Sequence, residues 1–184
     1  MASSGPNSPG TLASEAHGTS TVAWTSPGNA AAQDDVYASA NVTAADVTEY
    51  LKATGFGFAI PAGANVDGIQ VEVERYASAS PNGAEDELVH IVKGGTVQTA
   101  ANRATATDWP AGADTDTYAS SGGPTDLWGV AWDASDINAA GFGAAIAAVG
   151  LASVQVEIDH VRITVYYTPP APAGAGGLLL LGVG

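Results

Sequence analysis

The chain has 184 residues, with 5 Lys and Arg against 19 Asp and Glu, so its net charge is −14. So few cations cannot neutralise a nucleic-acid backbone or bind an anionic membrane surface, and we expect no nucleic-acid and no membrane partner. The lack of cysteine excludes disulfides, thiol catalysis and thiolate metal sites. Because 37 residues are alanine, the larger apolar side chains suffice for only one core of about 130 to 150 residues.

Both ends are expected to lie outside that core. Residues 1–20 carry no Lys, no Arg and no apolar run, so we predict an extended N-terminal arm that neighbouring subunits hold, and no secretory signal. Residues 169–184 form a Pro-, Ala- and Gly-rich C-terminal tail. Its one apolar run is a leucine block, Leu178, Leu179, Leu180 and Leu181. This block is far shorter than the roughly 20 residues of a membrane span, and we predict that it fills an apolar groove on another protein.

Residues 21–168, between the tails, show the apolar and polar alternation of antiparallel strands. The cleanest alternation covers 68–77, and a longer one covers 154–168. In the longer segment the apolar parity switches near Asp159 and His160, which predicts a β-bulge or a strand that changes sheet. Shorter candidate strands lie at 21–24, 36–40, 50–60, 87–93, 96–100, 116–120, 126–129 and 142–149. Gly94 and Gly95 predict a two-residue hairpin turn.

Helical signals are weak throughout. Only 43–46, 133–138 and 143–149 could hold a turn or two of helix. About eight to ten short strands in one domain, without alternating helices, predict an all-β fold. We expect a two-sheet antiparallel sandwich, jelly-roll-like, over residues 21–168.

The chemistry-bearing residue types show no catalytic pattern. His17, His90 and His160 lack the spacing of metal ligands, so we expect structural or surface histidines, with no metal and no cofactor. Phosphate-binding loops and the Gly-x-Ser-x-Gly motif are absent, and no Ser-His-Asp triad stands out in a chain so rich in serine and aspartate.

Carboxylates are the remaining catalytic candidates, because a glycosidase needs only two. Glu72 with Glu74, and Glu157 with Asp159, lie at strand spacing opposite apolar residues. Solvated outer faces of sheets explain both pairs better than catalysis. The acidic loops at 85–87 and 114–116 offer oxygen ligands for calcium, but no calcium-loop motif supports a site there. We therefore expect that the protein is not an enzyme.

Tryptophan offers a different function. Aromatic platforms on a sandwich can bind sugars, and the chain has four tryptophans, Trp24, Trp109, Trp128 and Trp132. Because large apolar side chains are scarce, a core or subunit-interface role is favoured over a sugar platform. Trp109 precedes Pro110 in a predicted loop, so we expect it to be the most exposed of the four tryptophans. We expect Trp109, like the leucine block, to bind a partner.

A series of short motifs follows a specific order along the chain. It comprises 24–30, 35–38, 50–69, 126–129, 136–138, 141–143 and 158–167. Over roughly 24–167 this series resembles a family of phage and prophage virion proteins. The resemblance implies a jelly-roll-like accessory module of a virus particle. Among such modules, capsid cement or decoration proteins, commonly trimeric, fit the two tails better than receptor-binding fibres.

These observations give one expected function and one alternative. The expected function is a structural virion protein on the capsid exterior, with the major capsid protein and its own copies, as a homotrimer, for partners. Tails that embrace neighbouring subunits suit such an assembly. The alternative is a carbohydrate-binding or receptor-binding module of a tail fibre or head fibre, using Trp109 and Trp132.

Overall fold

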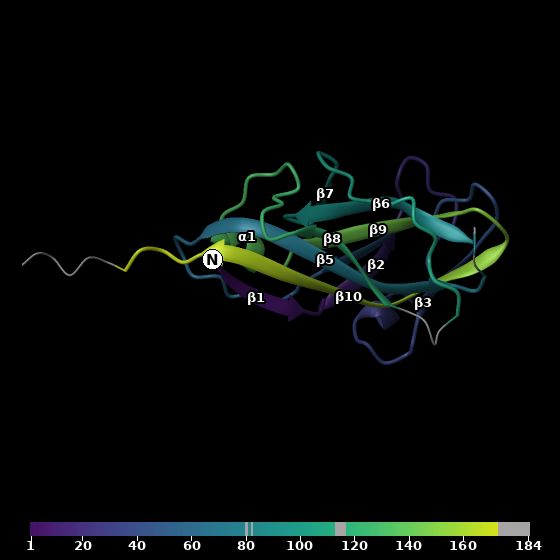
Figure 1. Ribbon diagram of the computed structural model, residues 1–184, viewed down its shortest axis with the longest axis horizontal. Helices are drawn as coiled ribbons and strands as arrows, with labels where there is room; N and C mark the ends of the chain where they lie inside the picture. Colours follow the sequence, from purple (N-terminus) through teal and green to yellow (C-terminus); the bar gives the residue numbers. More distant parts are fainter. Residues whose placement is uncertain (80, 82, 113–116, 173–184) are drawn as a thin grey trace, which may run out of the picture.

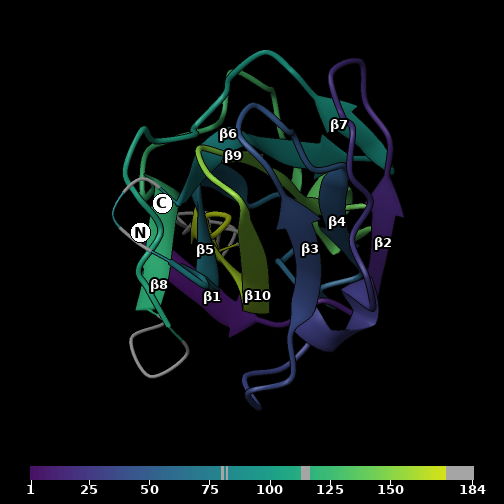
Figure 2. The same ribbon diagram turned by 90° about the vertical axis from the view of Figure 1, so that its right-hand side faces the viewer.

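A computed structural model of the chain describes residues 1–79, 81, 83–112 and 117–172. Its strands form two antiparallel sheets that lie face to face (Figures 1 and 2). Sheet A contains β1 (Ala2–Asn7), β3 (Ala38–Val42), β5 (Asn65–Ala77), β8 (Thr117–Gly123) and β10 (Val154–Thr168). Sheet B contains β2 (Thr11–Glu15), β4 (Tyr50–Thr54), β6 (Ala84–Lys93), β7 (Thr96–Gln98) and β9 (Gly143–Gly150).

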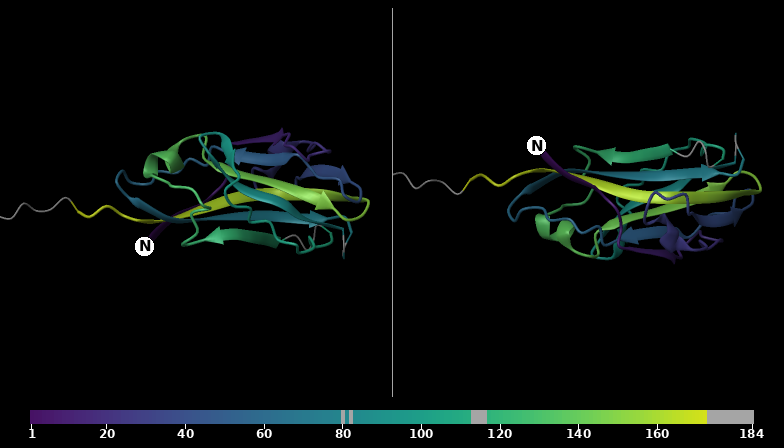
Figure 3. Two further views of the ribbon diagram at one scale, coloured as in Figure 1. Left: turned by 90° about the horizontal axis from the view of Figure 1, so that it is seen from above. Right: turned by 90° about the horizontal axis from the view of Figure 1, so that it is seen from below.

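The strand order is that of a jelly roll. Sheet A runs β3–β10–β5–β8 and sheet B runs β4–β9–β6–β7, so the chain crosses between the sheets at every step except the β6–β7 hairpin. This is the eight-strand arrangement of two interlocked Greek keys. The two layers are seen edge-on in Figure 3. The predicted all-β, jelly-roll-like sandwich is therefore confirmed.

The N-terminal segment is not a separate arm, which corrects the expectation for residues 1–20. β1 pairs with the C-terminal half of β10, from Ala2 opposite Tyr167 to Asn7 opposite Ile163. β3 pairs with the N-terminal part of the same edge of β10. β2 pairs with β4 along its whole length. A segment rich in Ser, Gly and Pro is held here by main-chain hydrogen bonds at sheet edges, so it needs no large apolar side chains of its own.

Several predicted elements have the predicted type. β5, β6, β7, β8, β9 and β10 overlap their candidate strands, and Gly94 and Gly95 form the β6–β7 turn with φ of 57° and 81°. β10 shifts its register against β5 between Ile158 and His160, so the predicted bulge is confirmed. The helix predicted at 133–138 is α1 (Ala134–Asn138). Asp133 and Asp136 cap its N-terminus with a capping box.

Other predicted elements are wrong. The 50–60 strand ends at Thr54, because Gly55 and Gly57 adopt φ of 75° and 65°. Residues 126–129 form a turn in which Trp128 has φ 58°, and 21–24 contribute only an isolated bridge at Val22. The 43–46 segment is a hydrogen-bonded turn, and 143–149 is strand rather than helix.

Two helices occur among the described residues, α1 and the 3-10 helix η1 (Pro27–Ala30), and α1 lies at the same end of the sandwich as the N-terminus (Figure 1). No helix in this part of the chain is long and apolar enough to cross a membrane.

The core fills the space between the sheets and draws on both. Its largest fully buried side chains include Trp109, Trp128, Phe142 and Leu51. Many positions are filled by alanine, as in β9, where Ala144 and Ala148 face the main core. A second cluster lies on the other face of β9, where Ala145 and Ala147 pack with residues that include Tyr50 and Val92.

Candidate functional site

Trp109 is buried, which corrects its expected exposure. Trp109 lies in the loop after β7, and its N–H donates to the carbonyl of Ala84 in β6 at 2.9 Å. Its indole Nε1 donates to Oδ1 of Asp86 at 3.0 Å, and its ring lies 5.0 Å from the guanidinium carbon of Arg75. With no exposed surface, Trp109 cannot serve as a platform for a sugar or a partner.

The acidic loop predicted at 85–87 is part of the same buried network. β6 shifts its register against β9 between Asp86 and Leu88, and Asp86 is buried and ion-paired with Arg75 at 3.0 Å. Burial lowers the pKa of Arg75, while the charge of Asp86 opposes the shift. Asp86 is therefore committed to an internal ion pair and is not available to calcium. The other predicted acidic loop, 114–116, lies outside the described residues.

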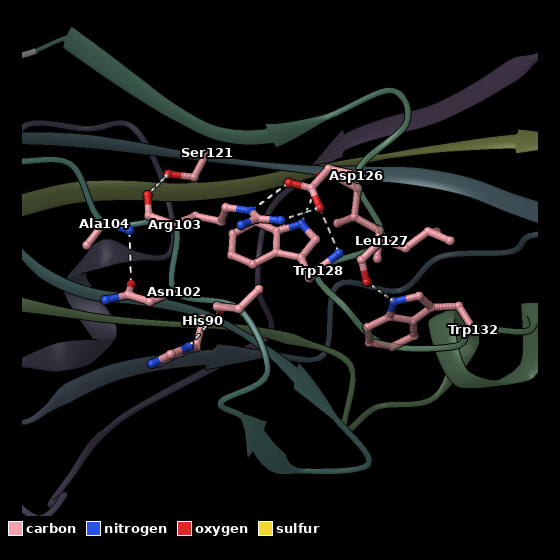
Figure 4. Close-up of polar contacts among 11 residues, drawn as sticks. His90, Asn102, Arg103, Ala104, Ser121, Asp126, Leu127, Trp128 and Trp132 are labelled. Atoms are coloured by element: carbon pink, nitrogen blue, oxygen red, sulfur yellow. Dashed lines mark hydrogen bonds and ion pairs between the residues drawn. The ribbon is translucent and has the colours of Figure 1, made fainter.

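The remaining tryptophans are also bound to the sandwich, and Figure 4 shows Trp128 and Trp132. Trp128 is fully buried and donates from Nε1 to the carbonyl of Ile69 at 3.0 Å. Arg103 covers it and forms two hydrogen bonds with Asp126, of 2.7 and 2.9 Å. Trp132 is half-buried and donates to the carbonyl of Leu127 at 3.0 Å. Trp24 is buried in the core, so the preference for core tryptophans is confirmed for three of the four.

The densest group of functional side chains lies on the outer face of sheet A. We call it the polar face: Ser8, Glu72, Glu74, Tyr118, Asp159, His160 and Arg162. Glu74 of β5 lies opposite His160 of β10 on one side and opposite Tyr118 of β8 on the other. Three adjacent strands, β10, β5 and the edge strand β8, therefore fix these side chains relative to one another.

A chain of hydrogen bonds crosses the polar face. His160 contacts Ser8 Oγ through Nε2 at 2.9 Å and the Tyr118 hydroxyl through Nδ1 at 2.8 Å. Tyr118 also hydrogen-bonds Glu74, and burial together with that carboxylate raises the pKa of Tyr118. Because a carboxylate only accepts, Tyr118 gives its single proton to Glu74. It follows that His160 donates from Nδ1 and accepts from Ser8 at Nε2.

The surroundings of His160 determine its protonation. Burial lowers the pKa of His160, and the charge of Arg162 lowers it further. The ring is therefore neutral at physiological pH. Chemically, the arrangement orients Ser8 toward a base and connects the β1–β2 turn with β8 and β10.

Arg162 forms the other half of the polar face. Its guanidinium lies 3.5 Å from the ring centre of Tyr118 and bonds Glu72 at 3.0 and 3.1 Å. A planar guanidinium suits this combination of a bidentate ion pair and an aromatic stack. The Glu72 carboxylate is thereby ion-paired with Arg162.

Asp159 lies in the bulge of β10 and is fully buried. Its Oδ1 accepts the N–H of Asp34 at 3.5 Å, and its Oδ2 has no hydrogen-bond partner. Burial raises the pKa of Asp159 to about 6, and the charges of Glu74, Asp34 and Asp35 add to the rise. The expectation that Glu74 and Asp159 belong to solvated faces is wrong, because both are buried.

Every Lys and Arg of the chain is already paired. The five ion pairs are Lys52–Glu15, Arg75–Asp86, Lys93–Asp136, Arg103–Asp126 and Arg162–Glu72. With 19 acidic side chains and five basic ones, the acids far outnumber the cations that could balance their charge.

The other predicted sites have the following positions. His17 donates from Nε2 to the carbonyl of Thr48 at 2.9 Å, and His90 donates from Nδ1 to the carbonyl of Ala101 at 3.0 Å. Within the described residues, no three His, Asp or Glu side chains already converge on one metal position, and no pocket is formed. The leucine block, Leu178 to Leu181, lies outside the described residues.

The polar face was missed by the sequence reasoning, although one signal pointed to it. The parity switch at Asp159 and His160 places two polar side chains in the centre of a long apolar strand. Such a break is typical of a functional position rather than of a plain sheet face. No local pattern indicates that Ser8 and Asp34 meet that bulge, because both come from distant segments.

Comparisons with protein-family models, curated proteins and solved structures found no match.

Proposed function

We propose that the protein is a structural, non-enzymatic component of a phage particle, a cement or decoration protein that binds the outside of the capsid and stabilises it. The observation that carries the proposal is the position of the chain ends. Ala2 pairs with Tyr167, so both ends of the sandwich domain lie at one end of the molecule (Figure 1). From there the exposed residues 169–172 lead toward the leucine block.

This arrangement gives the molecule a polarity. One end carries the C-terminal segment, whose sequence offers an apolar run to the major capsid protein and to neighbouring copies in a trimer. The opposite end presents loops to solvent. When many symmetric copies each carry a short binding segment, avidity raises their overall affinity for the shell, even where a single contact is weak. The net charge of −14 repels nucleic acid and keeps the copies apart in solution.

The burial of Trp109 weighs against the carbohydrate-binding alternative, because Trp109 was its main candidate residue. Trp109 is enclosed by the core, and the half-buried Trp132 is packed edge-on against Phe142 at 5.4 Å between ring centres. Neither presents an open ring face of the kind on which a sugar stacks, since Lys93 lies 5.3 Å from the Trp132 ring.

The test uses purified particles of the phage or prophage that encodes the chain. Particles are prepared with the full chain, with a chain that ends at Thr168, and without the protein. We expect the full chain alone to raise resistance to heat and osmotic shock, because the leucine block attaches it. A matched control replaces the four leucines of the block by serine in the full-length chain. Equal resistance of all particles would overturn the proposal.

A further inference from the structure

Ser8 is an exposed serine whose hydroxyl lies beside a histidine base. Its Oγ is 2.9 Å from Nε2 of His160, and Nε2 accepts the Ser8 proton because Nδ1 donates to Tyr118. The Tyr118 hydroxyl lies 2.8 Å from Nδ1. A nucleophile, a base and a group that orients the base are therefore in hydrogen-bond contact, which is the arrangement that activates serine in covalent catalysis.

The main chain holds both partners of this contact in place. Ser8 lies in the turn between β1 and β2, and the N–H of Gly10 binds this turn to the carbonyl of Thr54 at 3.0 Å. His160 is paired on both sides, with β5 and with an isolated bridge at Ala31. Because the geometry exists before any reagent arrives, little ordering remains to be done during the reaction.

We propose that Ser8 is an acylation site, which takes an acyl group from a small activated ester with His160 as the general base. The Ser8 proton passes to Nε2, Oγ bonds to the carbonyl carbon of the ester, and the bond from that carbon to the leaving oxygen breaks. The leaving alkoxide takes the proton from Nε2 and departs as an alcohol. His160 thereby returns to its neutral form, and Ser8 remains as an ester.

The surroundings of Ser8 limit the reaction to esters with a good leaving group. Pro9 has no N–H, and the N–H of Gly10 is bound to the carbonyls of Thr54 and Gly55. The two residues that follow Ser8 therefore offer no donor to the developing oxyanion. No pocket is formed among the described residues to hold a larger ester. Acylation is thus a single modification of Ser8 rather than turnover, and it does not depend on the proposed capsid function.

The protonation of His160 sets the pH range of the reaction. The titratable and charged groups around its ring are Glu74 on β5, Tyr118 on β8, Asp159 and Arg162 on β10, and Asp34 in the loop between η1 and β3. Burial and the charge of Arg162 lower the pKa of His160 below its ordinary value of 6.5, and Asp34 opposes the shift. The base is therefore available at neutral pH, and Ser8 should react more slowly as the pH falls through the His160 pKa.

The test exposes the full chain to p-nitrophenyl acetate and follows acetylation of each serine by peptide mapping with fragment-ion mass spectrometry. Ser3 is an exposed serine of β1 and provides the internal control. At neutral pH we expect Ser8 to be acetylated at least about a hundredfold faster than Ser3, because general-base assistance contributes a factor of that order. The same mapping separates acetylated serine from acetylated lysine and the acetylated N-terminus.

His160→Gln removes the base but keeps a side-chain amide that can contact Ser8, so Ser8 should then react no faster than Ser3. The pH profile of the wild type needs no substitution and guards against a folding defect in that variant. Between about pH 8 and pH 5 the ratio of the Ser8 rate to the Ser3 rate should fall as His160 gains its proton. The proposal is overturned if Ser8 reacts no faster than Ser3 in the wild type. It is equally overturned if that ratio is unchanged in His160→Gln or constant across the pH range.

Discussion

Asp86 joins Trp109 to Arg75 in the interior of the sandwich. One carboxylate oxygen accepts the indole N–H of Trp109 at 3.0 Å, and the other accepts a guanidinium N–H of Arg75 at 3.0 Å. Arg75 belongs to sheet A, Asp86 belongs to sheet B, and Trp109 belongs to the loop that connects β7 with β8. This one carboxylate therefore links both sheets to the connection between β7 and β8.

Asp86→Ala should destabilise the protein by about 3 to 5 kcal/mol, because it leaves the Arg75 charge buried without a partner. Urea denaturation followed by circular dichroism measures the loss. The control is Glu15→Ala, which breaks the exposed Glu15–Lys52 pair and should cost no more than about 1 kcal/mol. Equal losses in the two variants would show that the buried network has no special role.

Much of the fold could be predicted from local pattern. Clean alternation in 68–77 and 154–168 identified the two longest strands, and the parity switch located the bulge at Asp159. The Gly94-Gly95 pair specified a turn, because two successive residues with positive φ favour glycine. These features depend on neighbours in sequence, and so the sequence displays them.

The wrong predictions share a physical cause. They concern features that depend on contacts between residues far apart in the sequence. The first residues have no apolar alternation, yet edges of β10 and β4 offer unpaired main-chain groups that bind them. Trp109 looked exposed because it precedes Pro110, and only the distant Asp86 and Arg75 explain its burial. The polar face was likewise invisible, since Ser8, Glu74 and His160 are distant along the chain.

Asp159 should make the stability of the protein fall with rising pH. Its pKa is raised from 3.8 to about 6 by burial, so between these values the unfolded chain has lost a proton that the folded chain still holds. Folding then opposes ionisation, and stability declines from about pH 4 to about pH 6 relative to Asp159→Asn. Urea denaturation of both proteins across this pH range measures the difference. A difference that is constant with pH would contradict the assigned environment.

Gly143 is required by the close approach of β9 to β4. A Cβ at this position would lie 1.8 Å from the carbonyl oxygen of Ala53, which is main chain and cannot move aside cheaply. Gly143→Ala should therefore lower the Tm strongly or prevent folding. Gly28→Ala is the control, because a Cβ there meets nothing within 4 Å, and its Tm should match the wild type.

Deletion of residues 1–9 should destabilise the isolated protein by roughly 2 to 4 kcal/mol. It removes β1, with about 1 kcal/mol for each main-chain hydrogen bond. It also removes the contact of Ser8 with His160 and the 3.0 Å bond from Asn7 to the carbonyl of Phe56. Truncation after Thr168 should change stability by less than about 0.5 kcal/mol, because the core side chains of the described residues precede it. Urea denaturation compares the two, and the reverse ranking would contradict the assignment of β1 to the domain.

The most direct test of the capsid assignment is the copy number and position of the protein on purified particles. Quantitative mass spectrometry gives copies per capsid protein, and cryo-electron microscopy gives the position. The account predicts a fixed, symmetric number of copies on the outer surface, with the end that carries Met1 and Pro172 toward the shell. Absence of the protein from particles, or a location only at a tail fibre, would contradict it.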